Sequence, residues 1–232
     1  MKYDHPNGYD PKHSYPWSSD RTLLGWIPND KTVLELGCAT GYMGDFLHRN
    51  KRCNVTGIDS DLSAINKFKG SYKALIQGDL DDPTIFNPLN GQKFDIVLAA
   101  AVVEHVKSPS NLLRQIKCFM QSSSMLIVSL PNIAHWSIRL QLLGGQFSYN
   151  KYGILDDSHL RFFTYFSAQE TILEQGFIID QVSIDPDAGL PIINGIVRRF
   201  GGGWYLLNKL YNIWPNLFAY QVLIRACLDR QD

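Results

Sequence analysis

A run of small residues beside a carboxylate is the first feature of this sequence that could do chemistry. The run is Glu35-Leu36-Gly37-Cys38-Ala39-Thr40-Gly41, followed by Tyr42. Small side chains let a turn pass close to a bound nucleoside. The run fits poorly to G-x-G-x-x-G, the spacing with which a dinucleotide fold holds a pyrophosphate at a helix N-terminus. The sequence therefore favours binding of a nucleoside at this turn. The alternative is a turn whose small residues serve only the packing of the core.

Two further carboxylates could bind polar groups of such a nucleoside. Asp59 and Ser60 follow Gly57 and Ile58, and a carboxylate at this position can accept hydrogen bonds from both hydroxyls of a ribose. Asp79 can accept from an exocyclic adenine amine while Leu80 packs on the ring. The structural alternatives are a helix cap at Asp59 and a surface turn at Asp79.

A third group of residues would leave room for the ligand rather than bind it. Ala99, Ala100 and Ala101 end the apolar segment that begins at Phe94, and Glu104 and His105 follow shortly afterwards. Their methyl side chains leave space at the end of that segment. All of these residues come directly after apolar segments of strand length.

The elements that must position these residues alternate between strand and helix. Hydrophobic patterns predict strands at 31–36, 54–58, 74–76, 94–99, 125–130, 177–184 and 219–227. Helices are predicted at 19–26, 42–48, 61–68, 110–119, 132–145 and 167–176, the fifth capped by Asn132 and the sixth opened by a capping box of Ser167 and Glu170. This alternation predicts an α/β fold with a parallel sheet, whose ligands bind at the carboxyl ends of the strands.

The order of the motifs resembles that of class I S-adenosylmethionine-dependent methyltransferases. The motifs are E-x-G-x-x-x-G, G-x-D, G-D-L, and F-D-I-V with E-H-V. The resemblance implies a Rossmann-like, doubly wound sheet of seven strands in the order 3-2-1-4-5-7-6, with strand 7 antiparallel. It also implies S-adenosyl-L-methionine as cofactor, with Gly37 to Gly41 near its methionine part, Asp59 at the ribose, Asp79 and Leu80 at the adenine, and Ala99 to Ala101 alongside. The sequence departs from the pattern at Ala39, where many members carry glycine.

Residues further along narrow the resemblance. The stretch S-L-P-N-I-A-H-W at 129–136 and the run H-L-R-F-F-T at 159–164 look like a branch encoded beside, or fused to, bacterial glycosyltransferases of surface-polysaccharide synthesis. This branch implies O-methylation of a sugar hydroxyl on such a polysaccharide or its precursor, with a glycosyltransferase as a candidate partner. The methionine-biosynthesis W family carries a related P-N-x-x-x-W stretch, but the later run favours the polysaccharide branch.

Two other functions stay open. A protein like the methionine-biosynthesis W proteins would bind the cofactor and act as a partner of another enzyme. A nicotinamide-dependent oxidoreductase or epimerase would share the open sheet and Asp59, but the sequence has neither G-x-G-x-x-G nor a Y-x-x-x-K pair.

Three histidines are candidates for the general base of methyl transfer. They are His105, His135 and His159, since imidazole is suited to proton transfer near neutral pH. Each has a structural alternative: His105 as a loop cap, His135 in the core, and His159 with Arg161 as an anchor for the surrounding segment. Asp156 and Asp157 beside His159 are a weak metal pattern, because acidic turns are usually solvated, and no metal is predicted.

Composition limits the partners and the compartment. The chain of 232 residues has 22 basic and 22 acidic side chains, so no net field would attract nucleic acid, and a small-molecule or glycan acceptor fits better. The apolar runs are too short to span a bilayer, the N-terminus lacks a signal-peptide pattern, and four scattered cysteines predict free thiols in the cytoplasm.

The domain prediction is a single methyltransferase domain over residues 1–232. It includes an N-terminal arm at 1–20 and two insertions, 132–166 and 190–216, that line or cover the acceptor site. Aromatic residues in the second insertion would allow peripheral contact with a membrane.

Overall fold

Seven strands form one mixed sheet in the order β3-β2-β1-β4-β5-β7-β6. The computed structural model describes residues 9–11, 18–61, 63, 68–186 and 209–229. The strands are β1 Thr32–Leu36, β2 Asn54–Asp59, β3 Tyr72–Gln77, β4 Phe94–Ala100, β5 Met120–Pro131, β6 Phe177–Asp185 and β7 Gln221–Leu228. β7 is antiparallel to both of its neighbours, and the pairs from β3 to β5 are parallel. The predicted fold class, including its strand order and its antiparallel strand 7, is confirmed.

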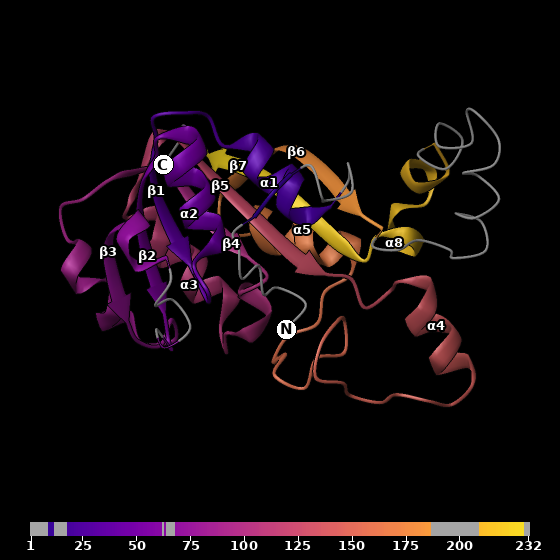
Figure 1. Cartoon of the computed structure of the whole chain (residues 1–232). Helices are drawn as coiled ribbons and strands as arrows, with labels where there is room; N and C mark the ends of the chain where they lie inside the picture. The colour runs from indigo at the N-terminus through magenta and orange to yellow at the C-terminus, as the bar shows by residue number, and fades with distance from the viewer. Residues whose placement is uncertain (1–8, 12–17, 62, 64–67, 187–208, 230–232) are drawn as a thin grey trace.

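Helices cover both faces of this sheet (Figure 1). The α-helices are α1 Ser19–Trp26, α2 Tyr42–Lys51, α3 Pro109–Lys117, α4 Trp136–Leu143, α5 Tyr165–Leu173 and α8 Pro215–Phe218, and the short 3₁₀ helices are η2 Lys69–Ser71, η3 Pro83–Leu89 and η4 Val103–His105. Residues of α1 and α2 pack on one face, and residues of α3 and α5 on the other. α4 lies away from both layers, beyond the carboxyl end of β5 (Figure 1).

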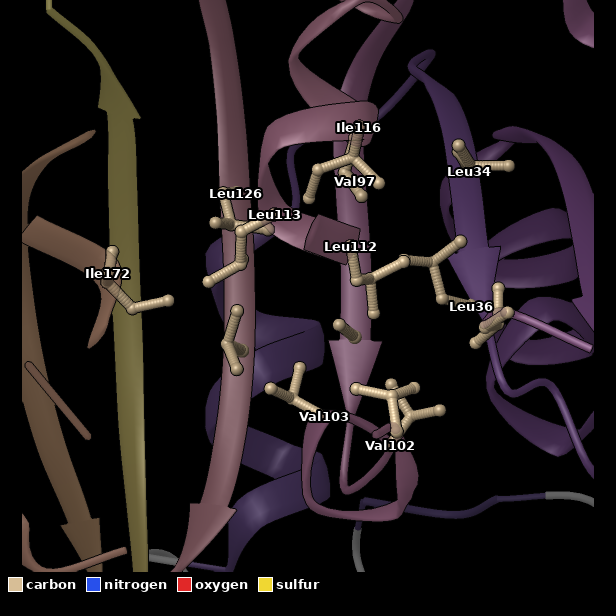
Figure 2. Packing of buried hydrophobic residues seen from close by; sticks show 14 of the residues in the cluster. Leu34, Leu36, Val97, Val102, Val103, Leu112, Leu113, Ile116, Leu126 and Ile172 are labelled. Atoms are coloured by element: carbon tan, nitrogen blue, oxygen red, sulfur yellow. The ribbon is translucent and has the colours of Figure 1, made fainter. Parts of the chain in front are cut away.

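Alternating strand side chains supply the two layers of core. In β4, Ile96 and Leu98 face the α1 and α2 layer, while Val97 and Ala99 face the layer that contains α3. Figure 2 shows Leu112, Leu113 and Ile116 of α3 near Val97 and Leu126 of the sheet. Burial of each large aliphatic side chain stabilises the fold by about 1.5–3 kcal/mol. Because β1 pairs in parallel with both β2 and β4, the carboxyl ends of these strands share one edge.

The predicted start of the helix after β5 is wrong by four residues. The sequence pattern places its cap at Asn132, but α4 begins at Trp136 and its N-cap is His135. Asn132 is instead completely buried, and its side-chain amide donates to the backbone carbonyls of Asn216 at 3.0 Å and Ala219 at 2.8 Å. Tertiary contacts thus use a residue whose local pattern is typical of a cap.

The capping box predicted at Ser167 and Glu170 is also wrong. α5 begins at Tyr165 with Thr164 as its N-cap, and the reciprocal partner of Thr164 is Ser167. The Thr164 hydroxyl accepts from the Ser167 N–H at 3.1 Å, and the Ser167 hydroxyl accepts from the Thr164 N–H at 2.9 Å. Serine at the third helical position therefore fills the role that the pattern gave to glutamate.

Several predictions fall on residues that the structure does not describe. The helix predicted at 61–68 lies mostly outside the described residues, as does most of the arm at 1–20 and of the insertion at 190–216. The four cysteines are free thiols, as predicted. Among the helices that the structure describes, not one has both the length and the apolar character that a membrane crossing requires.

Candidate active site

A cavity of about 220 Å³ lies at the carboxyl edge of the sheet. Its walls come from α1, from the ends of β1, β4 and β5, from the segment after α4 and from the start of β7. Residues 152–159 of the first predicted insertion form one wall. Ligands of open α/β sheets bind at this edge, which makes the cavity the candidate active site.

The turn after β1 brings backbone directly to the cavity. Gly37, Ala39 and Gly41 have left-handed backbone angles, with φ of +65°, +44° and +82°. A Cβ on Gly37 would lie 2.6 Å from Cγ2 of Val102, so only glycine fits there. Gly37, Cys38, Ala39 and Tyr42 line the cavity. The turn therefore offers the close backbone approach that a bound nucleoside needs.

The same turn has a buried polar atom outside the cavity lining. The hydroxyl of Thr40 is buried and has no hydrogen-bond partner among the described residues. Thr40 and Gly41 themselves are not part of the cavity lining. Gly41 instead closes the turn, because its N–H donates to the carbonyl of Cys38 at 2.7 Å.

Asp59 holds this turn in place from the neighbouring strand. One of its carboxylate oxygens accepts from the N–H of Ala39 at 2.7 Å, and the other accepts from the N–H of Asp61 at 2.9 Å. Asp59 and the exposed Ser60 lie outside the cavity lining. The carboxylate thus fixes the backbone of the turn at Ala39 from outside the cavity. Ribose binding by Asp59 stays a prediction.

The residues predicted to bind adenine and the predicted alanine run lie in different environments. Asp79 is exposed and accepts from the N–H of Asp81 at 2.9 Å, while Leu80 is buried in the core. Ala99 is buried, whereas Ala100 and Ala101 line the cavity. Their roles toward a cofactor stay predictions.

Glu35 brings an enclosed carboxyl group to the cavity. It is 4% exposed and accepts from the hydroxyl of Tyr72 at 2.7 Å. Burial raises the pKa of Glu35 to about 7, partly offset by the bond from Tyr72. Burial also raises the pKa of the Cys38 thiol, so this cysteine is protonated at neutral pH and a poor nucleophile.

Two of the three predicted base candidates meet in the cavity. His105 and His159 both line it, and their ring centroids are 4.8 Å apart in an edge-to-face arrangement. His135 is not part of the lining; it caps α4, with Nδ1 2.8 Å from the hydroxyl of Ser137. His135 is thus a helix cap outside the cavity, and the catalytic roles of all three histidines stay predictions.

Glu104 is a site residue that the sequence analysis noted only as a motif letter. It is 1% exposed, its Oε1 lies 3.9 Å from Nε2 of His159, and its Oε2 has no hydrogen-bond partner among the described residues. Burial raises the pKa of Glu104 to about 8. Its position beside His105 was the available signal, but nothing in the local sequence predicts that its side chain is buried.

Hydrogen bonds anchor the insertion that carries His159. The N–H groups of Leu160 and Arg161 donate to the carbonyl of Glu104 at 2.9 and 3.0 Å, and the Arg161 guanidinium donates to the carbonyl of Lys107. The anchoring role that the sequence left open for this segment is thus confirmed for Arg161. These hydrogen bonds hold the segment that contains His159 against η4.

A family model for methionine biosynthesis protein MetW matches residues 18–153. The chain belongs to the MetW family. The matched segment contains the turn after β1, Asp59, Asp79 and the Glu104-His105 pair. The H-L-R-F-F-T run at 159–164, on which the polysaccharide branch was inferred, lies outside it.

Curated relatives of this MetW family member are methyltransferases. The chain is 29% identical over 107 residues to (S)-coclaurine N-methyltransferase of Papaver somniferum, covering 44% of this chain and 30% of that protein. It is 29% identical over 116 residues to a ubiquinone biosynthesis O-methyltransferase of Bradyrhizobium diazoefficiens, covering 50% of this chain and 46% of that protein. The chain thus spans less than half the length of these relatives.

Solved structures support the fold of this MetW family member. An S-adenosylmethionine-dependent methyltransferase from Archaeoglobus fulgidus superposes with a TM-score of 0.59 and 18% identity, over 89% of this chain and 90% of that one. The similarity confirms the class I methyltransferase fold. The observed order with an antiparallel seventh strand also differs from the order 3-2-1-4-5-6 of dinucleotide-binding sheets, which disfavours the oxidoreductase alternative.

Proposed function

We propose that this protein is an S-adenosylmethionine-dependent methyltransferase that O-methylates a sugar hydroxyl of a bacterial surface polysaccharide or its precursor. The observation that carries the proposal is one cavity bounded on one side by the turn after β1 and on the other by residues 152–159. A methyl donor and an acceptor must meet in such a space. The methyltransferase relatives and the fold support the reaction class.

The chain's own residues suit the cofactor in size and polarity. S-adenosylmethionine supplies an electrophilic methyl group on a sulfonium. Gly37 to Gly41 would hold its methionine part, since the left-handed turn exposes backbone to the cavity. Asp59 would accept from the ribose hydroxyls, Asp79 from the adenine amine, and Ala100 and Ala101 would give the cofactor room.

The opposite wall suits an acceptor rich in hydroxyl groups. Methyl transfer requires the acceptor atom to be held roughly 3 Å from the methyl carbon, in line and away from water. Tyr152, Asp156, His105 and His159 together offer an aromatic face, a carboxylate and two imidazoles. A sugar presents hydroxyls at its rim and C–H groups on its face, which match these side chains.

The same proposal sets the protein in the cytoplasm beside a glycosyltransferase. The H-L-R-F-F-T run at 159–164 supports this setting, because it carries the resemblance to the polysaccharide branch and contains the cavity residue His159. Peripheral contact with a membrane that holds a lipid-linked glycan is part of this proposal.

A second candidate function is a cofactor-binding partner protein without turnover of its own. The match of the MetW family model to residues 18–153 favours it, because the match covers the cofactor edge but ends before Asp156 and His159 on the acceptor side. Such a protein would bind S-adenosylmethionine but methylate no acceptor. Detectable turnover separates the two candidates.

The test of the cofactor is calorimetric titration with S-adenosylhomocysteine, with NADH as the control ligand. We expect micromolar binding that Asp59→Ala weakens more than tenfold. Asp61→Ala is the matched control, since the Asp61 carboxylate accepts from the N–H of Ser63 at 2.8 Å. The substitution keeps the backbone N–H that donates to Asp59, so affinity should stay unchanged. Absence of binding, or a preference for NADH, would contradict the cofactor assignment.

The acceptor is tested by transfer of a labelled methyl group from S-adenosylmethionine. Nucleotide sugars and lipid-linked glycans are compared with phenolic and amine acceptors, because the relatives described above are O- and N-methyltransferases. We expect methylation of a sugar hydroxyl. Methylation confined to a phenol or an amine would refute the sugar assignment, and cofactor binding without any turnover would favour the partner-protein function.

A further inference from the structure

We propose that Glu104, His105 and His159 form a binding site for one divalent transition-metal ion, such as Zn²⁺. One potential ligand atom from each of the three residues lies within 4.8 Å of the other two. Around an ion bound at about 2.0–2.2 Å, tetrahedral ligand atoms are roughly 3.4 Å apart. Small rotations of the three side chains would therefore bring all three ligand atoms within bonding distance of one ion.

The hydrogen bonds of the two imidazoles prepare them as ligands. Nδ1 of His105 lies 3.2 Å from the carbonyl of Ser158, and Nδ1 of His159 lies 3.0 Å from the carbonyl of Ile154. A carbonyl oxygen can only accept, so Nδ1 of each neutral ring carries the proton and Nε2 keeps its lone pair. A backbone carbonyl on the remote ring nitrogen is the usual support of a metal-bound histidine.

Glu104 supplies the independent observation that points to a cation. Its side chain is 1% exposed and lines the cavity, and its Oε2 has no hydrogen-bond partner among the described residues. A buried carboxylate oxygen without a hydrogen-bond partner is costly unless it is paired with a charge or binds a metal. Among the described residues, the nearest basic side chain is His159, whose Nε2 lies 3.9 Å from Oε1 of Glu104, beyond hydrogen-bond distance.

The ligand set favours a particular class of ion. Two imidazoles and one carboxylate suit zinc and other first-row transition metals, whereas Mg²⁺ and Ca²⁺ prefer oxygen ligands. Three protein ligands would leave at least one coordination position open. All three residues line the cavity, so that position would be available to an acceptor oxygen, a role that rests on the proposed function.

The site also depends on two separate segments of the chain. Glu104 and His105 belong to η4, whereas His159 lies after α4 and is held against η4 by the bonds from Leu160 and Arg161 to the carbonyl of Glu104. Nothing in the spacing of the sequence brings these residues together. Bound metal would therefore lock the insertion onto the sheet.

The test uses the untagged full chain, stripped with a chelator and titrated with Zn²⁺ by calorimetry and with Co²⁺ by visible absorption. We expect one equivalent to bind, and His159→Gln and Glu104→Gln each to weaken binding at least tenfold. His48→Gln is the matched control, because His48 is exposed on α2 and should leave binding unchanged. Circular dichroism of each variant verifies that it is folded, and Glu104→Gln keeps the size of the side chain.

The outcomes separate this inference from the proposed function. Absence of stoichiometric Zn²⁺ or Co²⁺ binding, equal binding by His159→Gln, or binding of Mg²⁺ alone would overturn the metal site. Titration of the same metal-free protein with S-adenosylhomocysteine provides the second readout. Binding of S-adenosylhomocysteine without metal binding refutes only the metal site. Metal binding without binding of S-adenosylhomocysteine refutes only the cofactor assignment.

Discussion

At the scale of single residues, burial decides the protonation state of Glu35. The carboxyl lies at the end of β1, 4% exposed, with the Tyr72 hydroxyl as a donor and Asp59 as a nearby negative charge. Its pKa rises from 4.5 to about 7. The folded protein thus holds the proton more tightly than the unfolded chain does.

This shift predicts a loss of stability between about pH 4.5 and pH 7. Because the folded pKa is the higher one, the proton-linked stabilisation is complete below the unfolded pKa and is lost as pH rises through the folded pKa. Glu35→Gln keeps an acceptor for Tyr72 and does not ionise. As pH rises, we expect the free energy of unfolding of the variant to increase relative to that of the wild type, by at most about 3 kcal/mol.

Urea unfolding at several values between pH 5 and pH 7.5 measures this gain. Glu174→Gln is the control, since Glu174 is exposed and its replacement should leave the pH profile of the wild type unchanged. Parallel profiles for Glu35→Gln and the wild type would refute a raised pKa at Glu35.

At the scale of elements, the start of α5 shows what determines which residue becomes the N-cap of a helix. Both Thr164 and Ser167 can cap a helix, and Ser167 with Glu170 matches the usual box. The structure caps α5 with Thr164, and its third helical residue, Ser167, returns the bond. Phe163 forms a bridge with Asn132 directly before this cap, so pairing of the preceding residue sets where the helix begins.

The two assignments of the cap predict different effects of alanine. Thr164→Ala removes a side-chain acceptor from the first turn and should lower the free energy of unfolding by about 1 kcal/mol. Glu170→Ala, on an exposed side chain, should change it by less than about 0.5 kcal/mol. Chemical denaturation of both variants distinguishes the two assignments. A larger loss of unfolding free energy in Glu170→Ala than in Thr164→Ala would favour the capping box of Ser167 and Glu170.

At the scale of the whole molecule, Asn132 joins segments that are far apart in the sequence. Its amide donates to the carbonyls of Asn216 and Ala219, and its side-chain oxygen accepts from the N–H of Ala134. It therefore ties the end of β5 to α8 and to the approach to β7.

Replacing Asn132 should reduce global stability. Asn132→Ala leaves buried carbonyls without a donor, and we expect a loss of about 2–3 kcal/mol in the free energy of unfolding. Asn132→Asp should cost more, because a carboxylate cannot donate to these carbonyls. Urea unfolding measures both, with Asn150→Ala as an exposed control. Wild-type stability in Asn132→Asp would contradict the assigned donor role.

Local patterns in the sequence by themselves determined the strands, most of the helices and the turn after β1, whereas the strand order was expected from the family resemblance. Alternating apolar segments specify strands and helices locally, and the small residues at 37–41 make a turn that must lie at the strand end. Such features depend on neighbours along the chain, so they are visible without a fold. The same is true of α1, whose predicted bounds equal the observed Ser19–Trp26.

Only the tertiary structure decided which polar residues meet. His105 and His159 lie far apart in the sequence, yet their rings are in contact, while His135 is turned into a helix cap. Glu104 lines the cavity and is removed from water only in the folded chain. Burial and contact between distant segments set the charge and the partners of these side chains. Neither can be predicted from the neighbouring residues in the sequence.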